Sequence, residues 1–434
     1  MNVTRRFFLQ STGALALYMG VSPLTLLGAN GRPLGTRTVK KGKTLVVIFL
    51  RGGADGLNLV VPHGDGAYAK MRPSIAVPGP AARAEGRAID LDGFFGLHPR
   101  LAPLVPLFES GMAVAAHAVG YDKNTRSHFE EQDTWETGMT GNTIHSDGWL
   151  NRHLATSQGH GQIRAVSIGD ALPRILHGKA PAFAIRGLDD LTVPTGKAST
   201  ESIAAALEHA YCCGAPSQRA GVQADATDLL SQTAGTTLDG MEQLRELAKA
   251  KYEPASPYPR SGLAGRLMQV ARLIKADVGL EVAELDLGGW DTHNNQGNGQ
   301  FGPLANLAGE LAEAVAAFTA DMGDRMEDVL LVTISDFGRT AHENGTNGTD
   351  HGWANCLFAV GGAVQRAGKA NPARGRVVGQ WPGLAPDQLH QKRDLLHTTD
   401  FRDVLGELVK VHLGNDNIQT VLPQHQFKPV GLVA

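Results

Sequence analysis

The stretch at residues 44–58, TLVVIFLRGGADGLN, indicates the class of fold. Its first seven residues form a continuous β-prone run, which is typical of a strand buried on both faces of a sheet. Similar runs recur at residues 112–119, 282–287, 329–335 and 357–360. The glycines that follow the first run permit a tight turn, which would present the carboxylate of Asp55 at the end of the strand.

Stretches with helical periodicity lie between these runs. One of them places apolar residues at spacings of three and four along a single stripe: Leu304, Leu307, Leu311, Val315 and Phe318. Further helices are expected at residues 199–211, 222–250, 262–276 and 400–413. Buried strands that alternate with long helices predict a three-layer α/β/α sandwich with a mostly parallel central sheet, in a single domain over residues 44–434.

The N-terminal residues have the pattern of an export signal. Residues 4–10, TRRFFLQ, reproduce the twin-arginine pattern Ser/Thr-Arg-Arg-x-Phe-Leu-polar at nearly every position. The apolar run at residues 11–28 is too short, and too interrupted by glycine and proline, for a membrane span. The alternative is a chance Arg-Arg pair before an amphipathic helix. We therefore expect a twin-arginine signal peptide at residues 1–30, a linker at residues 31–43, and a periplasmic or extracellular protein with no stable membrane span after cleavage.

Composition excludes several classes of function. A formal net charge of -3 provides no basic field for nucleic acid, and no polybasic run is present for membrane lipids. The three cysteines, Cys212, Cys213 and Cys356, form no CxxC motif, which argues against iron–sulfur clusters, c-type haem and cysteine-built zinc sites. Either Cys356 pairs with one of the other two, or all three are buried thiols.

Polar residues collect where the predicted strands end. In open α/β sheets, ligand sites form in the crevice beyond the carboxyl ends of the strands. Each of four predicted strands is followed there by a polar cluster, and a fifth cluster leads into the last strand: RGGADGLN at 51–58, TRSHFEEQD at 125–133, GGWDTHNNQ at 288–296, SDFGRT at 335–340 and DHGW at 350–353. We expect these loops to converge on one rim of the sheet.

The residue types in these clusters suit a divalent metal. Mixed Asp and His ligation is typical of zinc or manganese, or of a harder ion such as calcium, and one or two ions are expected. A pair of ions could clamp the entering and leaving oxygens of a phosphoryl or sulfuryl transfer. The expected ligands are Asp55, Asp291, His293, Asp336, Asp350 and His351. The expected catalytic residues are Ser127, as a nucleophile activated by metal, and His128.

Each cluster also has a purely structural interpretation. Asp55 could hydrogen-bond its own backbone in the glycine-rich turn. Ser127 and His128 could begin a helix, with Glu130 in its first turn, and Asp336 could cap the turn after its strand. The Asp-x-His pair at residues 291–293 could serve only as a source of loop hydrogen bonds.

Several motifs resemble those of DUF1501 proteins, and the resemblance extends over essentially the whole mature chain. They are the twin-arginine start and the segments at 49–58, 289–293, 335–340, 348–353 and 398–405. That family is uncharacterised in function and is similar in fold to the alkaline phosphatase and sulfatase superfamily.

The resemblance implies roles for individual residues. Asp55 resembles the first metal-ligand aspartate of that superfamily, and Asp291 and His293 resemble its Asp/His pair. Asp336 resembles the aspartate of its Asp-His dipeptide, and His351 resembles its final histidine. Ser127 is the nearest candidate for its nucleophile. Phe337 departs from the pattern because the superfamily has histidine there. Asp350 or His342 would have to replace that ligand, or one metal binds, or hydrolysis has been lost.

The resulting expectation is a metal-dependent hydrolase of phosphate or sulfate esters, acting on a small-molecule or glycan ester. The alternative is a non-catalytic exported protein that keeps the fold, with a degenerate metal site, and binds a glycan or an exported protein partner. An exported redox enzyme is the third hypothesis, but the Gly52–Gly56 turn is not a GxGxxG fingerprint and no other nucleotide motif is present.

Overall fold

The computed structural model describes residues 42–141, 146–159, 161, 163–188, 240, 243–371 and 375–434. The expected signal peptide, nearly all of the linker, Cys212, Cys213, the helix at 199–211 and most of the helix at 222–250 lie outside the described residues. Cys356 is a buried free thiol. Within the described residues, no helix combines the length and the apolar character that a membrane crossing requires.

A nine-stranded sheet forms the centre of the molecule. Its order is β11-β5-β10-β9-β1-β8-β6-β7, and β12 also pairs with β5. Every pairing is parallel except those that β10 makes with β5 and β9, so the expected mostly parallel sheet is confirmed. The strands are β1 (Thr44–Leu50), β5 (Ala113–Gly120), β6 (Ala165–Ile168), β7 (Phe183–Ile185), β8 (Val282–Leu287), β9 (Val329–Ser335), β10 (Asn355–Gly361), β11 (Val377–Val378) and β12 (Thr399–Asp400).

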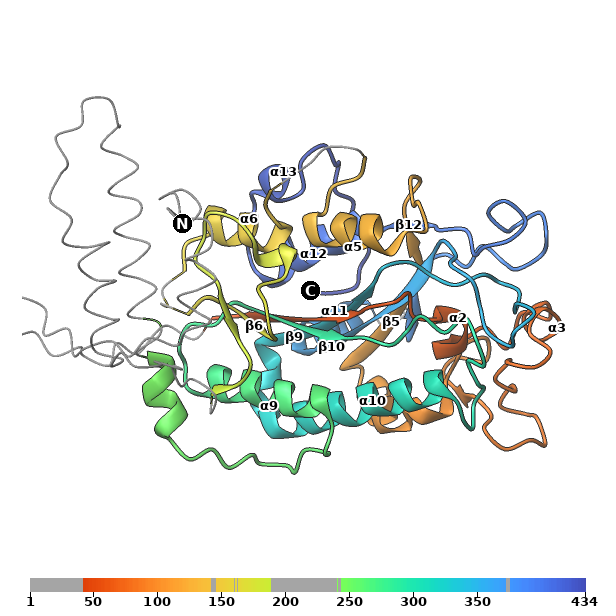
Figure 1. The fold of residues 1–434 in the computed structure, drawn as a ribbon, viewed down its shortest axis with the longest axis horizontal. Coiled ribbons are helices and arrows are strands. Elements are labelled where there is room, and N and C mark those ends of the chain that lie inside the picture. The colour runs from red at the N-terminus through yellow and green to blue at the C-terminus, as the bar shows by residue number, and fades with distance from the viewer. Residues whose placement is uncertain are drawn as a thin grey trace, which may run out of the picture.

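Helices cover both faces of this sheet, which gives the expected three layers (Figure 1). On one face lie α9 (Gly262–Lys275) and α10 (Pro303–Met322), which correspond to two of the predicted helices. On the other lie α5 (His128–Thr137), α6 (Trp149–Thr156), α12 (Phe401–Glu407) and α13 (Ile418–Val421). The helix expected at 400–413 is α12 continued by the π-helical turn η5 (Leu408–His412).

Strand β1 shows why the sheet is covered twice. Val46, Ile48 and Leu50 belong to the core on the α9 and α10 side, whereas Leu45, Val47 and Phe49 belong to the core on the other side. Burying each of these side chains contributes roughly 1.5–3 kcal/mol. A strand with six such residues is stable only where helices cover both of its faces.

Short elements complete the described chain. A small second sheet has the order β2-β4-β3. Its strands and the remaining helical segments are β2 (Val60–Val61), β3 (Ile89–Asp90), β4 (Gly96–Leu97), α2 (Gly56–Leu59), α3 (Tyr68–Met71), α4 (Val105–Glu109), α11 (Gly362–Ala370), η1 (Pro99–Leu104), η2 (Arg174–Leu176) and η4 (Gly323–Glu327).

Candidate metal centre

Three neighbouring parallel strands end at the same level of the sheet. Leu50 at the end of β1 is in register with Leu287 of β8 and with Ser335 of β9. The loops after these strands therefore begin side by side. Gly52 has a φ of +114°, and a Cβ at this position would lie 2.6 Å from the backbone nitrogen of Asp291. Glycine is required here because the loop after β1 runs directly against the loop after β8.

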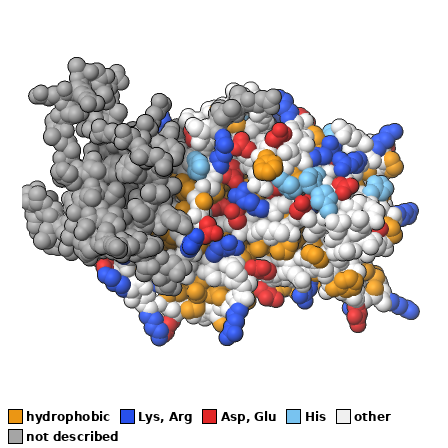
Figure 2. All heavy atoms as spheres, in the orientation of Figure 1, with side chains coloured by type: hydrophobic (Ala, Val, Ile, Leu, Met, Phe, Trp, Pro, Cys, Tyr) orange, Lys and Arg blue, Asp and Glu red, His pale blue; other side chains and the backbone are white. Residues whose placement is uncertain are grey.

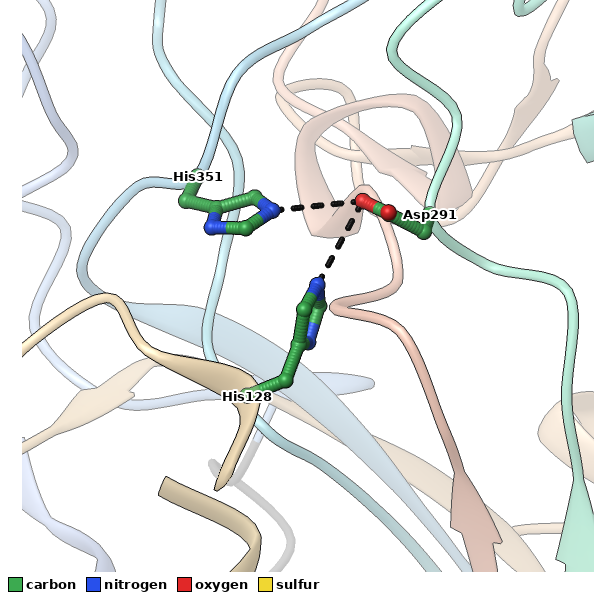
Figure 3. Close-up of side chains that lie close together, drawn as sticks. All are labelled: His128, Asp291 and His351. Atoms are coloured by element: carbon green, nitrogen blue, oxygen red, sulfur yellow. Dashed lines mark hydrogen bonds and ion pairs between the residues drawn. The ribbon is translucent and has the colours of Figure 1, made fainter. Parts of the chain in front are cut away.

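Three side chains from separate segments converge at this edge. His128 begins α5, Asp291 follows β8, and His351 precedes β10. Each offers one ligand atom, and these atoms all lie within 4.8 Å of one another. Figure 3 shows both imidazoles pointing toward the carboxylate of Asp291, whose Oδ1 lies 3.5 Å from Nε2 of His128 and 3.3 Å from Nε2 of His351. Two ligands of a tetrahedral zinc ion lie about 3.3 Å apart, and both distances to the carboxylate of Asp291 are close to this spacing.

A buried carboxylate orients His128. Nδ1 of His128 lies 2.6 Å from Oδ2 of Asp336, which also accepts a hydrogen bond of 2.9 Å from the amide of Gln132. The other oxygen of Asp336 accepts from the backbone N–H of Gly52 at 3.1 Å. Nε2 of His128 is buried and has no hydrogen-bond partner among the described residues. A histidine with one nitrogen bound to a carboxylate and the other free is typical of a metal ligand.

A backbone carbonyl orients His351. Its Nδ1 donates to the carbonyl of Arg126 at 2.8 Å, which leaves Nε2 directed toward Asp291. Burial lowers the pKa of His351, which favours its neutral imidazole. The hydrogen bond with Asp336 raises the pKa of His128, and a metal would therefore compete with a proton for that residue.

His293 borders this group. Its Nε2 lies 2.9 Å from Nε2 of His351 and 3.1 Å from Oδ1 of Asp291. Its Nδ1 lies 3.2 Å from Oδ1 of Asp350, which also accepts a 3.0 Å hydrogen bond from the amide of Asn344. The Asn344 hydrogen bond lowers the pKa of Asp350, although burial opposes the shift, and His293 lowers it further.

Arg339 joins the loops that carry the site. Its buried guanidinium donates to Oδ1 of Asp291 at 2.7 Å. Burial raises the pKa of Asp291, but the hydrogen bond and the charge of Arg339 outweigh this effect and lower it, so the carboxylate is ionised at neutral pH. The same guanidinium donates to four backbone carbonyls, those of Gly52, Gly53, Trp290 and Thr349.

A second charged network, centred on Arg51, contacts α5. Arg51, directly after β1, donates to Asp286 at 2.5 Å, to Glu136 at 2.6 Å and to Gln132 at 3.1 Å. Since Gln132 also holds Asp336, the network links the ends of β1 and β8 to the helix that carries the site. Figure 2 shows histidine, acidic and basic side chains gathered on this face of the molecule.

The expected ligands lie at different distances from the convergent group of His128, Asp291 and His351. Asp291 and His351 belong to the convergent group, with His293 beside it and Asp350 behind His293. Asp336 lies behind His128 and contacts the group only through that residue.

Asp55 does not contact the group. Its side chain is fully buried, and Oδ2 accepts hydrogen bonds of 2.6 Å from both Arg72 and Gln296. Arg72 is also fully buried, so the two form an interior ion pair. At the end of the first strand, where the sequence predicted a metal ligand, the structure therefore has a carboxylate that is already paired with an arginine.

Ser127 occupies the N-cap position of α5, as the structural interpretation predicted, but its side chain makes no capping hydrogen bond. Phe337 is buried, and its ring lies 4.8 Å from that of His128 and 4.6 Å from that of His351. At this position, where the family resemblance implied a departure from a ligand histidine, the phenyl ring packs against the imidazoles of His128 and His351.

Neither proposed substitute for that ligand is part of the convergent group. Asp350 contacts His293, and His342 is exposed. The additional histidine of the group is His128, which the sequence suggested only as a catalytic neighbour of Ser127. Arg72 and Arg339 were not singled out at all, since an arginine in a loop carries no signal that it will be buried.

Comparison with known proteins gives a family and a distant structural likeness. The family model of DUF1501, described as a protein of unknown function, matches residues 109–421. No curated protein matches the chain. Among solved structures, the chain is similar to the PsFucS1 sulfatase from Pseudoalteromonas sp., with 11% sequence identity, a TM-score of 0.31 and coverage of 81% of this chain. The match spans 65% of the sulfatase chain.

Proposed function

We propose that this chain, which belongs to the DUF1501 family, is an exported metal-dependent hydrolase of phosphate or sulfate esters. The observation that supports the proposal is the convergence of His128, Asp291 and His351 at the carboxyl end of a parallel sheet. Sites in open α/β sheets form at this edge. Two imidazoles and a carboxylate are also the donor set of many catalytic zinc sites, which keep a position open for water or substrate.

In this proposal the three residues hold one divalent ion, which would polarise an ester oxygen and lower the pKa of a bound water. Asp336 and Gln132 keep the imidazole of His128 in its orientation. Arg339 holds the carboxylate of Asp291. The side chain of Asp291 is 48% exposed, so an ester group attached to a larger molecule, such as a glycan, can reach the site from solvent.

We assign the attacking oxygen to Ser127. It directly precedes His128, and its hydroxyl is not used to cap α5. Its Oγ would bond to phosphorus or sulfur as the bond to the ester oxygen breaks, and the hydroxyl proton would pass through solvent to that oxygen, which leaves as the alcohol. Water would then cleave the bond to Oγ, which restores the serine hydroxyl and releases the inorganic anion.

Metal analysis and a substrate screen test the proposal together. Protein purified without chelator should contain about one equivalent of a divalent metal, and a His351→Gln variant should contain much less. A panel of aryl phosphates, phosphonates and sulfates, screened with added zinc, manganese and calcium, should identify an ester that is hydrolysed. Chelation should stop that turnover, and added metal should restore it.

Two observations favour the alternative of a non-catalytic exported binding protein. Phe337 occupies the position of an expected ligand, and Arg339 already neutralises Asp291. A metal content below roughly a tenth of an equivalent would support this alternative, as would bound metal with no turnover of any ester.

Export by the twin-arginine pathway is part of the proposal and rests on residues 4–10. Replacing Arg5 and Arg6 with lysine should retain the protein in the cytoplasm, as measured by cell fractionation. Unchanged export of this variant would contradict the assignment.

A further inference from the structure

We infer that Arg126 and Arg393 form a binding site for a second anionic group of the substrate, beside the ester that is hydrolysed. The inference rests on the hydrolase proposed above and names its substrate class. That class is an acidic glycan, in which a carboxylate or a further sulfate or phosphate lies next to the scissile ester. Neither arginine belongs to the proposed metal site.

Both arginines lie directly against His351. The carbonyl oxygen of Arg126 lies 2.8 Å from Nδ1 of His351, and Nη2 of Arg393 donates to the carbonyl oxygen of His351 at 3.0 Å. The two arginines come from distant segments, since Arg126 precedes α5 and Arg393 belongs to the loop between β11 and β12. A group bound by these arginines would therefore lie close to the metal site, within reach of the same glycan.

Two guanidinium groups share one carboxylate here. Nη2 of Arg126 donates to Oδ2 of Asp394 at 2.6 Å, and Nη1 of Arg393 lies 3.6 Å from the same oxygen. One negative charge leaves two positive charges incompletely compensated. Asp394 is 0% exposed, whereas the side chains of Arg126 and Arg393 are 22% and 41% exposed. An anion that approaches from solvent therefore meets the guanidinium groups and not the buried carboxylate.

The neighbouring charges keep the balance positive. Lys392, directly before Arg393, is exposed and adds a positive charge. The charge of Arg393 also acts on Asp350, but that carboxylate already accepts a hydrogen bond from Asn344. The three basic side chains therefore outnumber the two carboxylates, Asp394 and Asp350.

Arg126 is held in place without a ligand. Its Nη2 also donates to Oε1 of Gln391 at 2.9 Å, and its guanidinium carbon lies 5.1 Å from the centre of the Trp353 ring, a cation–π contact. A guanidinium that is already fixed loses little conformational entropy when it binds an anion. Among the described residues, the guanidinium of Arg393 makes one hydrogen bond, to His351, which leaves further N–H donors for a ligand.

The backbone around these arginines is strained. The angle φ is +60° at Arg126, +53° at Gln391 and +58° at Lys392, in the left-handed region that residues with a side chain rarely adopt. Such conformations persist where the surrounding structure enforces them, and they cluster at functional sites. Here the hydrogen bonds from Arg126 to Gln391 and Asp394 join the two strained segments.

The chemistry of the guanidinium group selects the ligand. Its planar fork of N–H donors matches two oxygens of a carboxylate, sulfate or phosphate, and charge-assisted hydrogen bonds are roughly twice as strong as neutral ones. The scissile ester would lie at the metal, so the group bound by the arginines is a second anion of the same glycan. A neutral sugar offers hydroxyl groups but no charge that compensates the two arginines.

The experiment measures binding by calorimetry, on the full chain as purified and at fixed ionic strength. The probes are polygalacturonate, which carries carboxylates, dextran sulfate, and neutral dextran. Arg393→Gln removes the more exposed guanidinium. Arg260→Gln is the matched control, because Arg260 is exposed and lies next to α9, on the other face of the sheet. Circular dichroism verifies that each variant is folded. Arg393→Lys, which keeps the charge but loses the planar fork, replaces Arg393→Gln if that variant does not fold.

We expect the unmodified chain to bind at least one of the two anionic polymers and to bind dextran far more weakly. Arg393→Gln should weaken the binding of the anionic polymer by about 10-fold or more, because charge-assisted hydrogen bonds are lost. Arg260→Gln should leave it within about twofold. The polymer that binds more tightly identifies the second group as a carboxylate or a sulfate. Equal weakening by both variants indicates non-specific attraction to positive charge and overturns the inference, as does a chain that binds neither anionic polymer.

Failure of this inference can be told apart from failure of the proposed function, because binding needs no turnover. If the anionic polymer binds through Arg393 but no ester is hydrolysed, the anion site stands and the hydrolase proposal falls. If esters are hydrolysed, Arg393→Gln should raise the KM of an ester that carries a second anionic group and leave the KM of a simple aryl ester unchanged. If it changes neither KM, the hydrolase proposal stands and the anion site falls.

Discussion

Exchanging Asp55 for asparagine should destabilise the fold and leave the metal content unchanged. Oδ2 of Asp55 lies 2.6 Å from Nη1 of Arg72, and both side chains are 0% exposed. Removing one partner of a buried ion pair costs about 3–5 kcal/mol, because the remaining charge stays buried without compensation. Arg72 keeps three neutral oxygen acceptors, on Asn58, Thr340 and Ala341. We therefore expect the lower end of that range, about 3 kcal/mol.

Asp291→Asn is the matched comparison: it should lose the metal and change the stability of the fold less than Asp55→Asn does. Its side chain is 48% exposed, and asparagine keeps an oxygen that can accept from Arg339. The guanidinium of Arg339 is buried but keeps four backbone carbonyl acceptors, so the loss of stability should be smaller than that of Asp55→Asn. Losing a charged ligand, by contrast, should empty the metal site.

Urea unfolding gives the free energy of unfolding of both variants, and elemental analysis of protein purified without chelator gives their metal content. The reasoning is refuted if Asp55→Asn loses the metal while its unfolding free energy stays within about 0.5 kcal/mol of the unmodified chain. Asp55 would then be a ligand, as the family resemblance implied, and its ion pair with Arg72 would be of little energetic importance.

Three further predictions concern other residues. Ser127→Ala should abolish turnover of an aryl phosphate or sulfate and retain the metal, and full activity of this variant would exclude Ser127 as the nucleophile. Asp336→Asn should weaken zinc binding by about 10–100-fold in calorimetry, because His128 loses the carboxylate that orients it, and unchanged affinity would contradict that role. Burial opposes ionisation of Glu281, but hydrogen bonds with His153 and Arg164 outweigh it and lower the pKa of Glu281 from 4.5 to about 2. A lowered carboxyl pKa stabilises the fold above pH 4.5, and this contribution is lost as the pH falls toward 2. Glu281→Gln should therefore flatten the acid side of a plot of unfolding free energy against pH. An unchanged slope would refute the assignment.

Much of the fold could be predicted because its signals are local. The runs that form β1 and β9 are seven residues long and apolar on both faces, and the stripe that begins at Leu304 lies on the buried side of α10. Strands β6 and β7 were not predicted because four and three residues are too few to show a pattern. Their place at the edge of the sheet depends on pairing with β8 and with each other, which no local property encodes.

Residue periodicity and turn chemistry act over a few residues, so the pattern of amino acids predicted strands buried on both faces and polar loops after their carboxyl ends. What each polar side chain faces depends instead on how distant segments pack. Asp55 and Asp291 both follow strands that end at one edge, yet Arg72 neutralises the first in the interior, while the second joins His128 and His351 near the surface. The physical reason is that a buried charge takes its partner from whichever loop the sheet brings beside it: Asp336 and His128, 208 positions apart in the chain, meet only because β9 and α5 pack together.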